Sequence, residues 1–462
     1  MLFTTYSYFV FLLLAVVGHW LLRAPIARAV WLIACSLVFY ILTQGLFVFV
    51  LLAYVIFNWW AGLRLAALKE RGPFLRVVLL ANLLPLLYYK YWPTLLHTVL
   101  PETGITLLAT VPIAAPLGIS FFAFQASAYL VDVSRGGAPM ASLLDFTLFK
   151  TFWAQLVAGP IVRASELRDQ LRVRTWDTSA SIAGCGRIVN GLTKKIVFSD
   201  LVAPFANQAF QTANPTFLDA LFGTLAFGLQ IYFDFSAYSD IAIGSAQLIG
   251  FRLPENFDWP YSARSPQEFW QRWHMTLSRW IRDYVFMPLT MHYRRNPMAA
   301  RGSIVLAMAL CGVWHGAGWT FLMWGLWHGL LLAANATFLR GFFSLTQEVA
   351  WRRWLAFAAT FVAVQIGWIF FRAESVSQVS DFVRALVTLR AGLQRAAVRE
   401  NGIIIVGLLW FALLVIQYHR SRIAAWMTKP AMLLVVPPLR ALQLALVIVM
   451  HQNATSFVYF QF

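Results

Sequence analysis

Charged residues and cysteines are both scarce in this sequence. Only 12% of its 462 residues are Asp, Glu, Lys or Arg, whereas 60% are hydrophobic. Soluble domains are typically about 25% charged and about 45–50% apolar. The shortage of charge therefore excludes an ordinary soluble protein. The three cysteines, Cys35, Cys185 and Cys311, have no CxxC spacing and lie in apolar or nearly apolar segments, which indicates small buried side chains and neither a disulfide nor a metal set.

Several well-known active-site motifs are also absent. The sequence has no HExxH zinc motif, no GxSxG nucleophile elbow and no GxxxxGK[ST] phosphate loop. No spacing of histidines and carboxylates suggests a metal, so we predict no metal site. There is no repeat of about 20–50 residues and no inverted half of the kind that many transporters contain. These absences leave a neutral imidazole as the best candidate for a reactive group, acting as a general base.

The charge that remains is mostly positive, and its distribution matters more than its size. Lys and Arg number 36 against 19 Asp and Glu, which gives a formal net charge of +17. The basic residues are scattered between apolar runs and form no patch, so we predict no nucleic-acid partner. Basic loops held on the cytoplasmic side of a membrane explain them better.

The apolar residues gather into long runs, and the mean hydropathy is +0.67. Runs of about 17–25 residues are long enough for a helix to cross about 30 Å of hydrocarbon. Gln44-Gly45 divides one run into two, and 146–160 favours a short or re-entrant helix. The 20 Trp and 15 Tyr are typical of aromatic belts, so membrane lipid is a predicted partner. The predicted membrane segments are 6–22, 29–60, 77–92, 116–136, 217–250, 302–338, 354–371, 403–418 and 441–460.

The run at 302–338 carries two histidines and no charged residue. An imidazole deep in hydrocarbon loses its hydration and needs a protein partner or a water-filled pocket. In a continuous helix, Cys311 and Trp319 would be the i−4 and i+4 neighbours of His315. Nearby glycines would let another backbone or a substrate approach closely. From these residues alone, His315 is either a catalytic base or a structural histidine, and His328 can join an interhelical hydrogen bond.

The segment 268–289 differs in kind because aromatic and basic residues alternate at helical spacing. This pattern predicts an amphipathic helix that lies at the membrane interface or lines a funnel. His274 lies within it, and the pattern by itself favours an interfacial structural role for that histidine. The apolar positions are Trp270, Trp273, Leu277, Trp280 and Tyr284, and the basic ones are Arg272, Arg279 and Arg282.

Two further features concern charge inside or beside apolar runs. Asp234 and Asp240 interrupt the run at 217–250 and suggest helix caps, a polar network or a cavity lining. Basic residues flank the run at 403–418 on both sides, and one span between them cannot leave both sides in the cytoplasm. The C-terminal third is therefore predicted to contain a re-entrant or interfacial segment, or an exception to the charge rule.

The order of several motifs resembles the membrane-bound O-acyltransferase (MBOAT) family, and more narrowly its bacterial alginate O-acetyltransferase-like branch. The resemblance covers nearly the whole chain. The blocks RWHMTLSRWIRDY and VWHGAGW are specific when they occur together. The other blocks are FFAFQASAYLVDVSRG, FWAQLVAGPIVR, GLTKKIVFSDLVAPF, YFDFSAYSDIAIG, NFDWPY and IGWIFFRAES. The resemblance implies an all-α polytopic domain over 1–462, with core motifs at about 116–340 and C-terminal spans at 350–462. It also implies about 11–13 transmembrane or re-entrant helices in a ring around a central catalytic funnel, with amphipathic interfacial helices.

The resemblance also implies roles for individual residues. His315 is the expected catalytic base, and His274 is the second expected catalytic residue, positioning donor or acceptor. No bound cofactor is expected; the pantetheine of acetyl-CoA, or another acyl thioester, would enter from the cytoplasm, and the acceptor from the other side. His315 would then activate an acceptor hydroxyl for attack on the thioester. The expected substrate-binding residues are Arg272, Trp273, Arg282, Asp283, Trp314 and Trp319.

The implied function is O-acetylation of an exported polysaccharide by a multi-pass protein of the bacterial inner membrane. A periplasmic acetyltransferase and exopolysaccharide machinery would be its partners. The motifs do not separate alginate, cellulose and peptidoglycan as acceptors. D-alanyl or other acyl transfer to a cell-wall polymer is one alternative. A transporter without chemistry is another, with Asp234, Asp240 and His315 as a proton relay.

Overall fold

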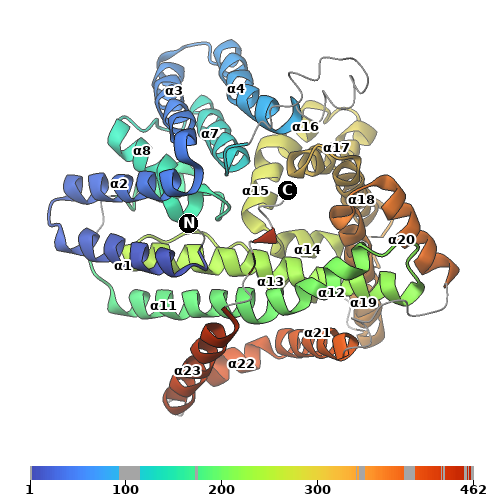
Figure 1. Ribbon diagram of the computed structural model, residues 1–462. Coiled ribbons are helices and arrows are strands. Elements are labelled where there is room, and N and C mark those ends of the chain that lie inside the picture. The colour runs from blue at the N-terminus through green and yellow to red at the C-terminus, as the bar shows by residue number, and fades with distance from the viewer. Residues whose placement is uncertain are drawn as a thin grey trace, which may run out of the picture. The chain divides into compact units, whose positions relative to one another are not determined.

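Helices account for all regular structure in the part of the chain that can be described. The computed structural model describes residues 3–92, 115–171, 175–339, 341–342, 349–389, 401–427, 429, 432–451, 455 and 457–458 (Figure 1). Every regular element within those ranges is helical, which confirms the predicted all-α class. A helix satisfies its backbone hydrogen bonds within one segment, which is what an apolar run surrounded by lipid requires.

Within the same ranges, five helices are long and apolar enough to cross a membrane, or six if one bent pair counts as a single span. The chain is therefore a multi-pass membrane protein. Three shorter apolar helices are Tyr6–Leu21, Ile119–Ser134 and Leu434–Met450. The predicted number of about 11–13 includes such shorter and re-entrant helices. The five long spans are Pro25–Ala67, Gly72–Tyr91, Phe217–Ile249, Pro297–His315 and Ala350–Arg372.

The chain folds into two compact units. The first comprises Met1–Ile188 and Tyr238–Pro254, and the second comprises Val189–Ala237 and Glu255–Phe462. The boundary falls within α13 (Phe217–Ile249), the 33-residue helix that carries both intramembrane aspartates. The predicted ring of helices, its funnel and its single-domain organisation remain predictions.

The first unit contains most of the N-terminal apolar helices. Gln44-Gly45 separates two of them as predicted, because Gly45 adopts a φ of +56° that favours glycine. Residues 146–160, predicted as one short or re-entrant helix, contain two short helices that meet at Phe152. The helices are α1 (Tyr6–Leu21), α2 (Pro25–Gln44), α3 (Val48–Ala67), α4 (Gly72–Leu86), α7 (Ile119–Ser134), α8 (Leu143–Thr151), α9 (Trp153–Leu156), α10 (Ala164–Arg168) and α11 (Thr178–Leu192).

Three buried polar side chains hold the short helices of this unit in place. Lys150 Nζ donates to the carbonyl of Phe122 (2.8 Å) and to Gln125 Oε1 (3.0 Å). Gln125 Nε2 donates to Gln155 Oε1 (2.9 Å), whose own Nε2 donates to the carbonyl of Phe149 (2.8 Å). These contacts supply partners to carbonyls near helix ends, which buried backbone groups require.

The second unit contains the two histidine blocks. Its segment from Glu268 to Leu289 was predicted as one helix and is divided in the structure. The elements of the second unit are the π-helical turn η3 (Thr193–Ser199), α12 (Asp200–Phe210), α14 (Pro266–Arg272), α15 (Met275–Ile281), the π-helical turn η5 (Arg282–Phe286), α16 (Met287–His292), α17 (Pro297–His315), α18 (Trp319–Thr337), α19 (Ala350–Arg372), α20 (Val376–Thr388), α21 (Ile403–Tyr418), α22 (Arg420–Met427) and α23 (Met432–Met450).

The apolar run at 302–338 forms an antiparallel pair of helices, α17 and α18, which lie side by side in Figure 1. The prediction that Trp319 follows His315 by one helical turn is wrong, because α17 ends at His315 and Gly316 is extended. The glycines were predicted to let another backbone or a substrate approach closely, and the first alternative is confirmed at Gly312. A Cβ on Gly312 would lie 2.2 Å from the carbonyl of Phe321, and one on Gly316 would lie 2.3 Å from the Phe321 ring. Protein atoms occupy that space.

Substitution of Gly312 should therefore disturb the α17–α18 pair. We expect Gly312→Ala to lower stability by about 1–3 kcal/mol, because backbone must move to accept the new methyl group. Thermal unfolding of the purified protein in detergent measures the loss. Gly302→Ala is the matched control, since the same helix leaves nothing within 4 Å of a Cβ there. Equal unfolding temperatures for both variants would contradict the close contact between the helices.

The C-terminal third contains the irregular segment that its charge pattern predicted. The axis of α21 bends by 71° into the helix Arg420–Trp426, as in a broken span or a re-entrant loop. The preceding α20 is amphipathic: it buries Val379, Phe382 and Ala385, whereas Val383 and Val387 on its other side are exposed. Residues 390–400, which carry part of the predicted basic segment, lie outside the described residues.

Candidate functional site

His315 lies at the end of α17 inside an aromatic cage. Its ring is 4.7 Å from that of Trp314, 5.0 Å from that of Trp324 and 5.1 Å from that of Phe371, measured between centroids. The side chains come from α17, α18 and α19, and only 6% of His315 is exposed. Rings from three helices therefore enclose the imidazole of His315.

His274 lies in a break between α14 and α15. The continuous amphipathic helix predicted over 268–289 is wrong, because α14 ends at Arg272 and His274 takes a left-handed conformation with φ +41° and ψ 53°. Four side chains of the predicted apolar stripe are at most 8% exposed and pack inside the protein: Trp270, Trp273, Leu277 and Trp280. A left-handed non-glycine residue is uncommon and is typical of functional sites.

A loop segment far upstream holds this break. The backbone N–H of Asp258 donates to the carbonyl of Arg272 (2.9 Å), and that of Met275 donates to the carbonyl of Asn256 (2.9 Å). The loop therefore pairs with both sides of His274. Asn256 and Asp258 had no predicted role, although both belong to the NFDWPY block. Residue spacing does not show that a loop pairs with a helix break.

The imidazole of His274 is fully enclosed. Its Nδ1 lies 3.1 Å from Asn256 Oδ1, and the Phe235 ring of α13 meets it edge-on at 4.7 Å. Burial lowers the pKa of His274 to about 3, because removal from water disfavours the charged ring. His274 lies outside the candidate membrane spans. The ring is therefore neutral at physiological pH.

Aromatic contacts join the two histidine blocks within the second unit. Trp273 packs on Trp368 at 4.9 Å, Trp368 meets Phe371 at 5.8 Å, and Phe371 contacts His315. This series connects the residue before His274 with the cage around His315. The structure thus places Trp273 and Trp314 in one aromatic cluster.

A second series of contacts passes through His328. Trp270 Nε1 donates to His328 Nδ1 (3.4 Å), and the rings of Trp270 and His328 both contact Trp324. His328 therefore joins α14 to α18. This arrangement agrees with its predicted helix-packing role.

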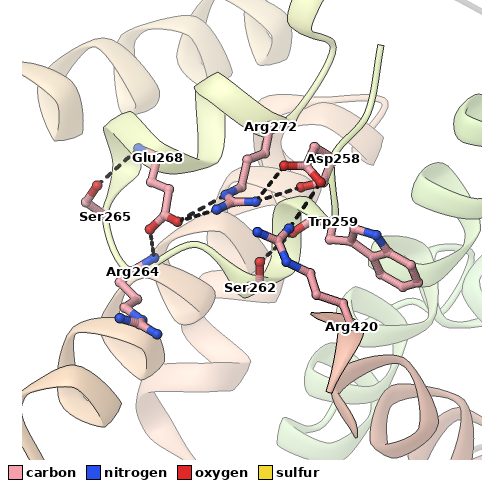
Figure 2. Close-up of polar contacts among 8 residues, drawn as sticks. All are labelled: Asp258, Trp259, Ser262, Arg264, Ser265, Glu268, Arg272 and Arg420. Atoms are coloured by element: carbon pink, nitrogen blue, oxygen red, sulfur yellow. Dashed lines mark hydrogen bonds and ion pairs between the residues drawn. The ribbon is translucent and has the colours of Figure 1, made fainter. Parts of the chain in front are cut away.

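Arg272 is held by carboxylates of the protein itself, as Figure 2 shows. Its guanidinium bonds Glu268 (2.9 Å) and Asp258 (2.8 Å), and Asp258 also pairs with Arg420 at 3.1 Å. The predicted i,i+4 pair of Glu268 with Arg272 is confirmed. These contacts use most of the N–H donors of the Arg272 guanidinium. The geometry therefore favours a structural role for Arg272, in which it anchors the end of α14. Its predicted contact with substrate remains untested.

The remaining predicted substrate residues lie in different settings. Arg282 and Asp283 begin η5 and pair with each other at 2.6 Å, and the Arg282 side chain is 58% exposed. Trp314 is buried beside His315, but Trp319 is 71% exposed at the start of α18. The structure does not bring Trp319 into the aromatic cage.

A cavity of about 510 Å³ opens near the cage, although none of Trp314, His315, Trp324 and Phe371 lines it. Its walls come from α14, α15, η5, α17 and α18, and Cys311 in its lining lies one helical turn before His315. Most lining side chains are apolar, with Arg279 and Arg282 among the polar ones. Pockets of about 300–1,000 Å³ with few polar groups are typical of sites for small organic ligands.

The two intramembrane aspartates form ion pairs, in agreement with the polar network that the sequence left open. In the second unit Asp234 bonds Lys195 at 2.9 Å, and in the first unit Asp240 bonds Arg187 at 2.9 Å. Among the described residues, no group of three or more His, Cys, Asp and Glu could hold a metal ion.

Comparison with known proteins agrees with this arrangement. A probable alginate O-acetylase of Azotobacter vinelandii is 38% identical over 377 residues, covering 80% of this chain and 74% of its own length. The protein of the same name in Pseudomonas aeruginosa is 37% identical and covers 80% and 71%. A peptidoglycan O-acetyltransferase of Helicobacter pylori is 32% identical over 426 residues, covering 82% and 78%. The family model of the membrane-bound O-acyltransferases matches residues 25–376. With both histidine blocks inside that match, the chain belongs to the membrane-bound O-acyltransferase family and is a multi-pass membrane acyltransferase.

Proposed function

We propose that this enzyme transfers an acetyl group from a cytoplasmic thioester towards the hydroxyls of an exported polysaccharide. The bacterial inner membrane would be its location. A periplasmic acetyltransferase would complete the transfer, or the polymer would accept the group directly. Relatives named for O-acetylation of alginate and of peptidoglycan support the acetyl group and the polymeric acceptor. The buried imidazole of His315 is the observation that supports the chemistry best.

The proposed reaction needs one base and no redox step. His315 removes the proton of the acceptor hydroxyl while its oxygen forms a bond to the thioester carbonyl carbon. The tetrahedral intermediate then breaks its carbon–sulfur bond, and the thiolate leaves with the proton that His315 had taken. The ester and a free thiol are the products. A neutral histidine in an apolar cage can perform both proton transfers.

The cavity near the cage suits the donor arm. Pantetheine is a narrow chain with amide groups, and a largely apolar cavity of about 510 Å³ would accommodate such a ligand. The Cys311 end of the lining would bring the thioester within one helical turn of His315. Arg279 and Arg282 in the lining would favour an anionic donor. Acetyl-CoA, a charged thioester, is the proposed donor.

D-alanyl transfer to a cell-wall polymer is the second candidate, because an aminoacyl thioester would react with His315 in the same way. The two activities differ in the acyl donor and in the polymer that accepts the acyl group. Relatives named for O-acetylation, at 32–38% identity, favour the acetyl donor.

Labelled acetyl-CoA distinguishes these candidates in the purified protein reconstituted in liposomes. We expect release of free CoA thiol and transfer of label to an oligosaccharide acceptor, with the His315→Ala variant inactive. Label accepted only from a D-alanyl carrier would support the second candidate. A protein that neither binds acetyl-CoA nor releases CoA would contradict acetyl transfer from this donor.

A further inference from the structure

The side chain of Asn256 makes an unusual set of contacts at the break that contains His274. Asn256 is 1% exposed, and its Oδ1 lies 3.1 Å from His274 Nδ1, 3.2 Å from the backbone nitrogen of Thr276 and 2.8 Å from Thr276 Oγ1. Its backbone carbonyl accepts from the N–H of Met275. One residue therefore binds both the ring and the backbone of the turn.

These contacts decide which atom of the amide faces His274. The backbone N–H of Thr276 can only donate, so the Asn256 atom that it meets must be oxygen. An amide oxygen can only accept. The hydrogen of the bond between Asn256 and His274 must therefore reside on His274 Nδ1.

The protonation state of the ring follows from its burial. Because the pKa of His274 is lowered to about 3, the ring carries a single proton. That proton is on Nδ1, so Nε2 holds a lone pair. Nε2 can accept a hydrogen bond or a proton, but it cannot donate one.

The backbone conformation of His274, like the hydrogen bond of its side chain, helps to orient the lone pair on Nε2. His274 has a left-handed φ of +41°, a conformation that is unfavourable for a residue with a Cβ. The contacts of Asn256 and Asp258 on both sides of the turn maintain it. Phe235 packs edge-on against the ring and restricts its rotation. The ring is thereby fixed in one tautomer and one orientation.

We propose that Asn256 is a positioning residue for the acyl transfer: it holds His274 in the Nδ1–H tautomer and in one orientation, so that Nε2 is an acceptor and not a donor during the transfer. The inference rests on the proposed function. It assigns His274 the role of a hydrogen-bond acceptor. His315 is the base that deprotonates the acceptor hydroxyl for attack on the thioester carbonyl carbon. An Asn256 variant without its oxygen would let the ring change tautomer and turn Nε2 into a donor.

Three variants test the role through kinetics. Asn256→Leu has a similar size and no acceptor, and we expect kcat to fall about 100-fold with KM little changed, as for other misoriented acid–base groups. Asn256→Asp keeps the accepting oxygen and should retain kcat within about tenfold. Thr276→Val removes a donor to the same oxygen and should change kcat less than about twofold. A purely structural role predicts instead that all three variants lower the yield of folded protein while kcat per folded molecule stays constant.

Nitrogen NMR of the histidine-labelled protein reads the tautomer without any substrate. We expect the His274 signal, assigned by its loss in His274→Gln, to show a protonated Nδ1 in the parent and a protonated Nε2 in Asn256→Leu. A parent signal from the Nε2–H tautomer would overturn the inference. So would normal kcat in Asn256→Leu, with the proposed function intact. Normal transfer by His315→Ala would instead remove the proposed function and leave the tautomer result standing.

Discussion

Replacing His315 with glutamine should lower the rate of acyl transfer about 1,000-fold and leave a folded protein in the membrane. A positioned general base contributes about 10²–10⁴-fold to a proton-transfer step, and His315 is the imidazole enclosed by rings from three helices. Glutamine fills most of the ring's volume but cannot accept and return a proton at neutral pH. Thiol release from the acyl donor measures the rate, and size-exclusion chromatography in detergent measures folding.

His328 offers a matched control for this prediction. Its ring contacts Trp324 at 5.2 Å, as that of His315 does at 5.0 Å, and it too is buried. His328→Gln loses the hydrogen bond from Trp270 and should lower stability, by about 1–3 kcal/mol for a buried donor left unpaired. Its rate per folded molecule should stay near that of the parent. Equal losses of rate in the two variants would show that the cluster acts only through packing and would contradict a base at His315.

The sequence predicted features of the fold that depend on local chemistry. Long apolar runs became helices, and Gly45 divides α2 from α3 because only its backbone adopts that conformation cheaply. The start of α14 is equally local, because Ser265 Oγ accepts from the N–H of Glu268 at 3.0 Å, although this start was not predicted. Each of these signals lies within a few residues of the feature that it produces.

The failures have a different cause, because they depend on contacts between distant segments. Tryptophan and arginine continue at helical spacing across Trp273 and His274, so periodicity alone shows no break there. Contacts from residues 256–258 hold the left-handed turn. The glycines after Cys311 are equally compatible with a continuous helix. Either another backbone or a substrate could approach such glycines, and the contacts of Gly312 with Phe321 and Gly325 decide for the backbone.

The candidate site was predictable to a similar extent. The two histidine blocks identified His315 and His274, and the structure joins the blocks through aromatic rings. The blocks did not show that Arg272 is committed to carboxylates or that Trp319 is exposed. Both facts depend on where an element ends, which is the least predictable property of a helix.

The second large effect concerns stability. Lys195→Ala should destabilise the protein by about 3–5 kcal/mol, because it leaves buried carboxylates without a counter-charge. Lys195 Nζ bonds Asp234 at 2.9 Å and Asp200 at 2.8 Å, and the three side chains are 0%, 1% and 4% exposed. Lys195 also donates to Thr455 (3.2 Å), and Asp234 accepts from the N–H of Val458 (2.9 Å). The expected result is a lower unfolding temperature and a smaller folded yield.

Two comparisons separate a loss of buried charge balance from a general loss of contacts. Glu374 is paired with Arg372 at 3.5 Å but its side chain is 79% exposed, so Glu374→Ala should cost about 0–1 kcal/mol. Combining Lys195→Met with Asp234→Asn and Asp200→Asn removes all three charges and should unfold at a higher temperature than Lys195→Ala alone. A combined variant less stable than the single one would show that the charges themselves stabilise this network.

The network also bears on the site, because Asp234 precedes Phe235, whose ring packs against His274. A shift of α13 in Lys195→Ala should therefore lower kcat beyond what the loss of folded protein explains.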